Sequence, residues 1–261
     1  MMADRAARTR RRRGMSVIVI GSLTVLGLIA AFFIVDAGAR SYAEGRVKQE
    51  IADNLPDTVT GDVSVSIGGI SVIAQYLSGS FDRVALTAPT LSVDGVAASV
   101  RVVATQVPVD QGKPVGDVRG VVDLDQASLN TLLRSSLAAD APDAELVLGD
   151  GEVRYTGSLS VLGFPVGYEA TATPTAVADS LLFTPTSAKV TTGSGSIDAG
   201  ELLPLIVGQQ PVRVCVAKYL PEGVSLARVN VTPERARITL ESSSLLLTRK
   251  SLTTLGTCSA G

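Results

Sequence analysis

An uninterrupted apolar stretch near the start of the chain constrains the fold and location of the residues that follow it. From Met15 to Val35 the chain runs for 21 residues without a charged residue or a proline. As an α-helix rising about 1.5 Å per residue, this stretch would be roughly 31 Å long, close to the hydrocarbon thickness of a bilayer. Core helices of soluble proteins rarely run so long without a polar face. Residues 15–35 are therefore predicted to be a transmembrane helix.

The residues on either side of this span indicate its orientation. Positions 1–14 carry six arginines and one acid, Asp4. The positive-inside rule then predicts a cytoplasmic tail at 1–14 and an extracytoplasmic domain at 36–261. Ala37-Gly38-Ala39 has the A-x-A pattern at which a signal peptidase could cut after Ala39. The span is longer than the usual signal-peptide core of about 7–15 residues, which favours an uncleaved signal anchor while leaving cleavage open.

Composition excludes several classes of function. Of the chain's 23 bases and 25 acids, 17 and 24 follow the tail, so the exported part carries a net charge of −7. It lacks the basic stripe or patch that predicts nucleic-acid binding. The chain has no histidine, which rules out Ser-His and Cys-His nucleophiles and histidine-ligated metals. We therefore expect neither a metal nor a cofactor.

The two cysteines fit an oxidising compartment. Cys215 and Cys258 lie 43 positions apart, and an even number of cysteines in an exported domain predicts a disulfide. Closing a loop of that length would stabilise the fold by about 4 kcal/mol in the chain-entropy model. The alternative is a pair of free thiols. No C-x-x-C motif points to redox catalysis.

The exported part reads as α+β with much antiparallel sheet. Residues 36–54 have helical spacing and are followed by Pro56, which stops the helix. Alternating apolar and polar residues predict strands at 63–67, 83–88, 96–109, 115–124, 152–161, 166–173, 212–217, 224–232 and 236–242. One further helix is predicted after Asp125, with Leu129, Leu132, Leu133 and Leu137 on one face.

No motif of an enzyme stands out. Asp123-Leu124-Asp125 is a D-x-D, which some sugar-nucleotide enzymes use to hold a metal, but it lies where an aspartate would cap the predicted helix. No lysine stands in an S-x-x-K motif. We predict no catalytic residue and no enzymatic activity.

What remains is an excess of aliphatic side chains. They could fill an ordinary core, or they could line a surface for acyl chains, which form no hydrogen bonds. The run from Gly69 to Leu77 breaks strand alternation after a Gly-Gly turn, and Tyr76 within it suits a boundary between water and an apolar phase.

Three segments carry a resemblance to a known family. They are VSIGGISVIAQYLSGSFDRV at 65–84, VVDLDQASLNTLL at 121–133, and CVAKYLPEGV at 215–224 together with Cys258. In this order they resemble the LmeA-like family of actinobacterial envelope phospholipid-binding proteins. In that family the first segment is a strand followed by a short apolar hairpin, often G-x-P-F. Here Gly69-Ile70-Ser71-Val72 lacks the proline, whereas Gly163-Phe164-Pro165 keeps the G-F-P form.

The resemblance implies a fold and a function. The fold would be a long curved antiparallel sheet wrapped with helices, similar to tubular lipid-binding domains. The function would be non-enzymatic phospholipid binding at the cell envelope, in support of lipoglycan or mannan assembly. Envelope glycan-assembly proteins would then be partners.

We accordingly predict a membrane-anchored extracytoplasmic domain that holds a phospholipid in an aliphatic groove. The candidate lining residues, all apolar and beside turns or on the predicted helix, are Ile70, Val72, Ile73, Tyr76, Leu77, Leu129, Leu132, Leu133 and Phe164. The alternative is an envelope scaffold that binds proteins and no lipid. A carboxylate-dependent glycosidase comes third.

Overall fold

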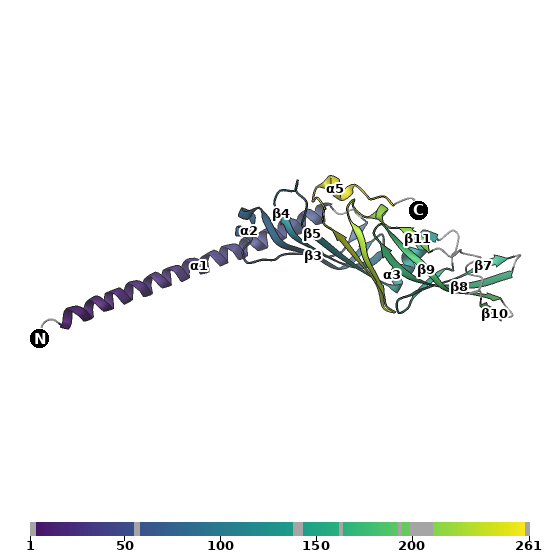
Figure 1. Ribbon diagram of the computed structural model, residues 1–261, viewed down its shortest axis with the longest axis horizontal. Helices are drawn as coiled ribbons and strands as arrows, with labels where there is room; N and C mark the ends of the chain where they lie inside the picture. The colour runs from purple at the N-terminus through teal and green to yellow at the C-terminus, as the bar shows by residue number, and fades with distance from the viewer. Residues whose placement is uncertain are drawn as a thin grey trace.

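The protein is a long helix that projects from an elongated, strand-rich domain (Figure 1). The computed structural model describes residues 4–54, 58–137, 143–161, 164–192, 195–198 and 211–258. The helical elements are α1 (Asp4–Asn54), α2 (Val72–Ser78), α3 (Gln126–Leu137), the 3-10 turn η2 (Ala217–Tyr219) and α5 (Arg249–Thr253).

The predicted span and the helix after it are one continuous helix, α1, which ends two residues before Pro56. Within the described residues, a stretch of α1 inside Leu23–Asp53 is apolar and long enough, by length and composition, to cross a membrane.

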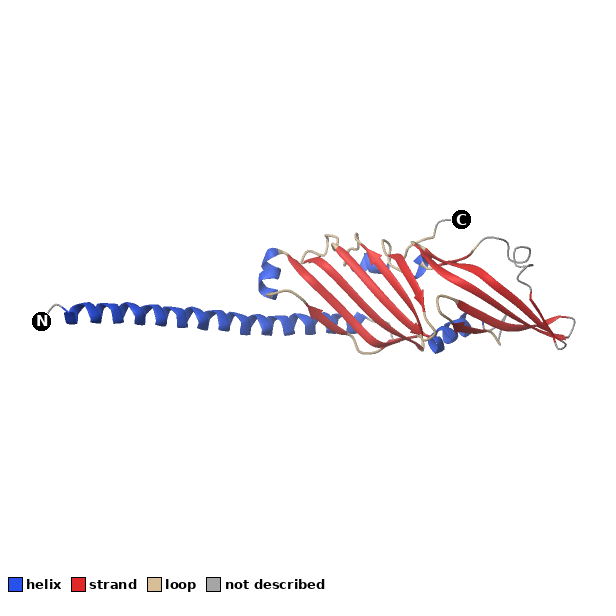
Figure 2. Ribbon diagram, turned by 60° about the horizontal axis from the view of Figure 1, so that its bottom comes forward, coloured by secondary structure: helices blue, strands red, loops and turns tan. Residues whose placement is uncertain are grey.

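Two antiparallel sheets follow α1 (Figure 2). The first has the strand order β1-β3-β4-β5-β13-β12, with β2 paired to β3. Its strands are β1 (Val59–Thr60), β2 (Ser64–Ile67), β3 (Ser80–Val93), β4 (Val96–Pro108), β5 (Asp117–Asp125), β12 (Ser225–Val231) and β13 (Arg235–Ser242).

The second sheet has the order β10-β9-β8-β7-β6, with β11 paired to β9. Its strands are β6 (Glu145–Leu148), β7 (Val153–Val161), β8 (Phe164–Val177), β9 (Ser180–Thr192), β10 (Gly195–Asp198) and β11 (Val212–Cys215). The two sheets meet where β12 contacts β8, and a bridge joins Ala178 to Leu226. The predicted α+β fold with an N-terminal apolar helix is confirmed, but the described strands form two open sheets where one long sheet was expected.

Where the family has a short apolar hairpin after this strand, this chain lacks the proline and forms the helix α2. Ser71 caps its N-terminus by accepting a hydrogen bond from the Ala74 amide, and Gly79 ends it in the left-handed conformation at φ 86°. Both are ordinary helix-end signals.

Candidate lipid-contacting site

The register of the first sheet gathers its apolar residues on one face. One row across three neighbouring strands is Val100, Val122 and Ile238, and the next is Val102, Gly120 and Leu240. Val102 is in turn paired with Leu86 on β3. Because side chains alternate between the two faces of a strand, these residues all project from the same side of the sheet.

The opposite face of the same strands is polar. Arg237 makes two hydrogen bonds to the carboxylate of Asp123, of 2.7 and 3.0 Å, and Arg119 lies 2.8 Å from Glu241. Asp123, the first aspartate of the D-x-D, is therefore a cross-strand ion-pair partner. The sheet thus has one face suited to water and one suited to aliphatic contact.

The middle of the apolar face is only partly covered. Two core clusters lie at opposite ends of the β5–β13 ladder, one around Val118 and Leu245 and the other around Val231 and Ala236. The apolar side chains between them remain half-buried, namely Leu86, Val100, Val102, Val122, Ile238 and Leu240. Aliphatic side chains left this exposed gain free energy when further apolar groups cover them.

Gly120 lies at the centre of this face. A Cβ atom built on it would lie 3.5 Å from Leu240 Cβ and 4.0 Å from Val102 Cγ2, which are ordinary van der Waals contacts. The glycine therefore leaves a depression between the two side chains, where a larger residue would stand above the face.

Helix α3 lies at the end of the face near Ala236. Leu129 packs against the core cluster of Leu148, Val231 and Ala236, while Leu133 is half-buried and Leu132 is exposed. Asp125 caps the helix by accepting a hydrogen bond from the Ser128 amide at 2.8 Å, and this bond holds the pKa of Asp125 below its usual value. The second aspartate of the D-x-D thus acts as the predicted cap.

The structure places five of the other predicted lining residues at the opposite end of the first sheet, on and before α2 (Figure 2). Ile70, Tyr76 and Leu77 are exposed, Val72 is buried and Ile73 is half-buried. Helix α2 packs against α1 and β3, whereas α3 packs against β4, β5 and β6. The structure therefore does not bring these two groups of residues together.

Phe164 begins β8, where it is paired with Val161. The surroundings of its side chain lie outside the described part of the structure.

A set of hydrogen bonds fixes α2 to α1. The carboxylate of Asp36 accepts bonds from the Ser71 hydroxyl at 2.7 Å and the Ile73 amide at 3.0 Å. Arg40, one turn further along α1, donates to the carbonyl of Gly69 at 2.8 Å. Glu44, a further turn along, accepts from the amide of Ile67 at 2.7 Å, which satisfies the free edge of β2. Sequence reasoning missed this attachment, because no local pattern links residues 36–44 to residues 67–73.

The ionisation of Asp36 makes the attachment of α2 to α1 dependent on pH. The amide of Ile73, followed by the hydroxyl of Ser71, lowers the pKa of Asp36 below its usual value. A carboxyl group with a lowered pKa stabilises the folded form above its unfolded pKa of about 3.9, and that stabilisation is lost as the pH falls through the folded value. We expect amide protection of residues 72–78 in hydrogen exchange to be high at pH 7 and to fall below about pH 4.

Asp36→Asn should lower the hydrogen-exchange protection of α2 by about tenfold already at pH 7. The asparagine side chain has the size of the aspartate but lacks the negative charge to which the Ser71 hydroxyl and the Ile73 amide donate. Asp53→Asn, at an exposed position near the end of the same helix, is the matched control and should behave as the wild type. Equal protection in the two variants would contradict this assignment.

The second sheet also has an apolar face, which includes two tyrosine hydroxyls. Tyr155, Ala170 and Ala188 are register partners across β7, β8 and β9. The hydroxyls of Tyr155 and Tyr168 lie 3.4 Å apart, and burial raises the pKa of Tyr155 to about 12. The phenol of Tyr155 is therefore neutral at physiological pH.

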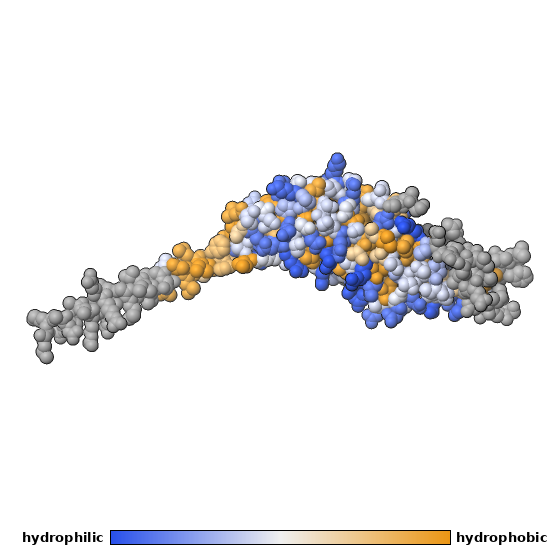
Figure 3. Space-filling view, in the orientation of Figure 1, coloured by the Kyte–Doolittle hydropathy of each residue, from blue (hydrophilic) through white to orange (hydrophobic). Residues whose placement is uncertain are grey.

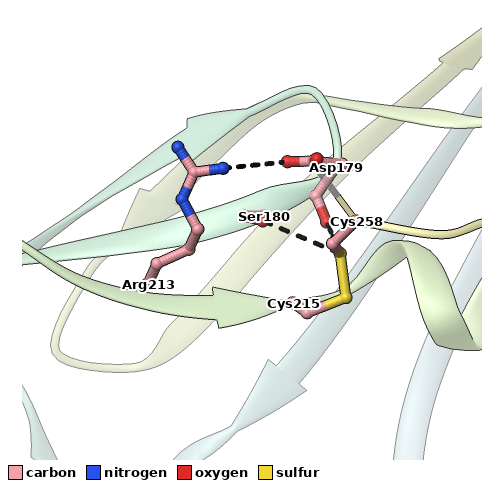
Figure 4. Close-up of a disulfide and its surroundings, with 5 residues drawn as sticks. All are labelled: Asp179, Ser180, Arg213, Cys215 and Cys258. Atoms are coloured by element: carbon pink, nitrogen blue, oxygen red, sulfur yellow. Dashed lines mark hydrogen bonds and ion pairs between the residues drawn. A yellow bond between two sulfur atoms is a disulfide. The ribbon is translucent and has the colours of Figure 1, made fainter. Parts of the chain in front are cut away.

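The predicted disulfide is formed between Cys215 at the end of β11 and Cys258 near the C-terminus, with a Cα–Cα distance of 5.9 Å (Figure 4). The fully buried Ser180 donates a hydrogen bond to Cys258 Sγ at 3.8 Å. Beside them Arg213 lies 3.8 Å from the carboxylate of Asp179. The bond ties the C-terminal segment to the second sheet. Among the described residues, no group of three or more Cys, Asp or Glu side chains is placed to hold a metal ion.

These features define an elongated α+β protein with an apolar N-terminal helix and a half-covered aliphatic sheet face. A family model for LmeA-like phospholipid-binding proteins matches residues 34–241, which is most of the chain. The chain therefore belongs to this family, as the three sequence segments indicated. Comparisons with curated proteins and with solved structures gave no significant match.

Proposed function

We propose that this protein is anchored in the membrane through residues 15–35 and holds a phospholipid outside the cytoplasm, with acyl chains on the apolar face of the first sheet. The observation that carries the proposal is the row of half-buried aliphatic residues around Gly120, in a chain of a phospholipid-binding family. Each methylene group covered there would gain about 0.8 kcal/mol. Helix α3, with Leu129, would close one end of the site, and the headgroup would stay at the rim.

The proposed location rests on three features. The arginine-rich tail before the apolar helix favours a cytoplasmic N-terminus. The disulfide is typical of an oxidising, extracytoplasmic compartment. The apolar helix provides the anchor. At this location the protein would supply or position phospholipid for lipoglycan or mannan assembly, in contact with glycan-assembly proteins and without catalysing a reaction itself.

Native mass spectrometry of the full chain tests the lipid-binding proposal. The chain would be reconstituted with vesicles of phosphatidylcholine and phosphatidylglycerol, extracted in mild detergent and washed. We expect a population carrying one or a few bound phospholipids that survives dilution of the detergent. A chain that releases all phospholipid under these conditions, and extracts none from fresh vesicles, would contradict the proposal.

A further inference from the structure

Helix α2 and the loop before it present apolar side chains that are mostly exposed to solvent. Ile70 is 83% exposed, Leu77 is 79% exposed and Tyr76 is 61% exposed. The buried residues of the same segment, Val72 and Gln75, hold it against the rest of the domain. From Gly69 to Ser80 the chain carries no charged residue. A contiguous apolar patch of this kind marks a binding surface.

The attachment to α1 decides where this patch lies. Asp36, which binds Ser71 and Ile73, is only 3% exposed and directly follows Val35, the last residue of the predicted span. At about 1.5 Å per residue, the contact lies within the first turn of α1 beyond the bilayer core. The exposed apolar surface of α1 from Leu23 to Val35 continues onto the end of the domain where α2 lies (Figure 3).

From this placement we infer that α2 and its preceding loop dock on the outer leaflet of the same membrane that α1 crosses. Ile70 and Leu77 would enter the boundary between headgroups and acyl chains, with Tyr76 at headgroup level, where amphipathic rings gather. The occupant of the patch is thus the lipid surface itself. The inference rests on the membrane anchoring in the proposed function and adds a second point of contact, which fixes how the domain stands on the bilayer.

The absence of tryptophan from the chain makes a direct test possible. Tyr76→Trp creates a single tryptophan at an exposed site and leaves the disulfide untouched. Tyr219→Trp is the matched control, since Tyr219 is 70% exposed but lies in η2 beside the second sheet. Each full-length variant would be reconstituted into phosphatidylcholine–phosphatidylglycerol vesicles, with or without phosphatidylcholine brominated on its acyl chains.

We expect the emission of Tyr76→Trp to shift to shorter wavelength and to be quenched at least about twofold by the brominated lipid, while Tyr219→Trp emits as in water and is not quenched. A Tyr76→Trp signal that is unquenched would overturn the inference, whether its emission is that of water or is shifted by a protein partner or a second copy.

Lipid retention by native mass spectrometry on the same samples separates the two proposals. Retained phospholipid together with unquenched emission from Tyr76→Trp would refute docking alone. Quenching of Tyr76→Trp without retained phospholipid would uphold docking and refute the lipid-holding function alone.

Discussion

Gly120→Phe should lower phospholipid retention by the full chain by about tenfold or more, a loss of at least about 1.4 kcal/mol in binding free energy. The new Cβ fits between Leu240 and Val102, so the ring would project above the apolar face and occupy the space proposed for an acyl chain. Because an aromatic residue suits a strand better than glycine does, the fold should tolerate the change. Native mass spectrometry and a vesicle extraction assay measure the loss.

Two controls make this result specific. Val121→Phe places the same ring on the neighbouring residue of β5, which faces the polar side between Arg101 and Thr239, and should retain phospholipid as the wild type does. Gly120→Ala adds only the Cβ that the site accommodates and should change retention little. Lipid that surrounds α1 in the detergent would be the same in all three variants. Undiminished retention by a folded Gly120→Phe would show that acyl chains do not lie on this face.

Replacing both cysteines by serine should lower the free energy of unfolding by about 4 kcal/mol, the chain-entropy value for a loop of 43 residues. The reason is that the bond between Cys215 and Cys258 restricts the unfolded chain and holds the C-terminal segment to the second sheet. Urea unfolding followed by circular dichroism measures the difference, and the wild type under reducing conditions should match the variant.

The single variant Ser180→Ala is the matched control for the double cysteine variant. It removes the hydrogen bond to Cys258 Sγ but keeps the disulfide, so its cost should be about 1 kcal/mol. A double serine variant as stable as the wild type would show that the segment is held by its other contacts, such as the bridge between Pro221 and Leu255.

Most elements of the first sheet could be predicted from the sequence, because their apolar residues recur with the spacing of a strand or a helix within a short segment. Apolar alternation marked β4, β5, β12 and β13, and Asp125 with its leucines marked α3. Helix α2 was missed although Ser71 and Gly79 bracket it as capping residues, because it is only seven residues long and so short an apolar run does not distinguish a helix from a buried strand. Strand β9 was missed because Thr184, Pro185 and Thr186 interrupt its apolar pattern.

The candidate site could not be read from the sequence for a different reason. Val102, Gly120 and Leu240 become neighbours only through the register of β4, β5 and β13. Along the chain, all the strands of the second sheet stand between β5 and β13, although the two strands are paired in the fold. The predicted lining came from apolar runs beside turns, which found the α2 patch and the α3 leucines but not the strand residues between them. Asp36 likewise acquires its partners only in the folded protein.

The continuity of α1 has a mechanical consequence. If residues 15–35 cross the bilayer as proposed, residues 36–54 extend the same helix by about 28 Å beyond it without a hinge in the described structure. A flexible tether would let the domain search a hemisphere of positions, whereas a stiff strut braced at Asp36, Arg40 and Glu44 holds it at one height and one angle. Any protein that exchanges lipid with this domain would then have to meet it at this fixed height and angle, close to the membrane surface.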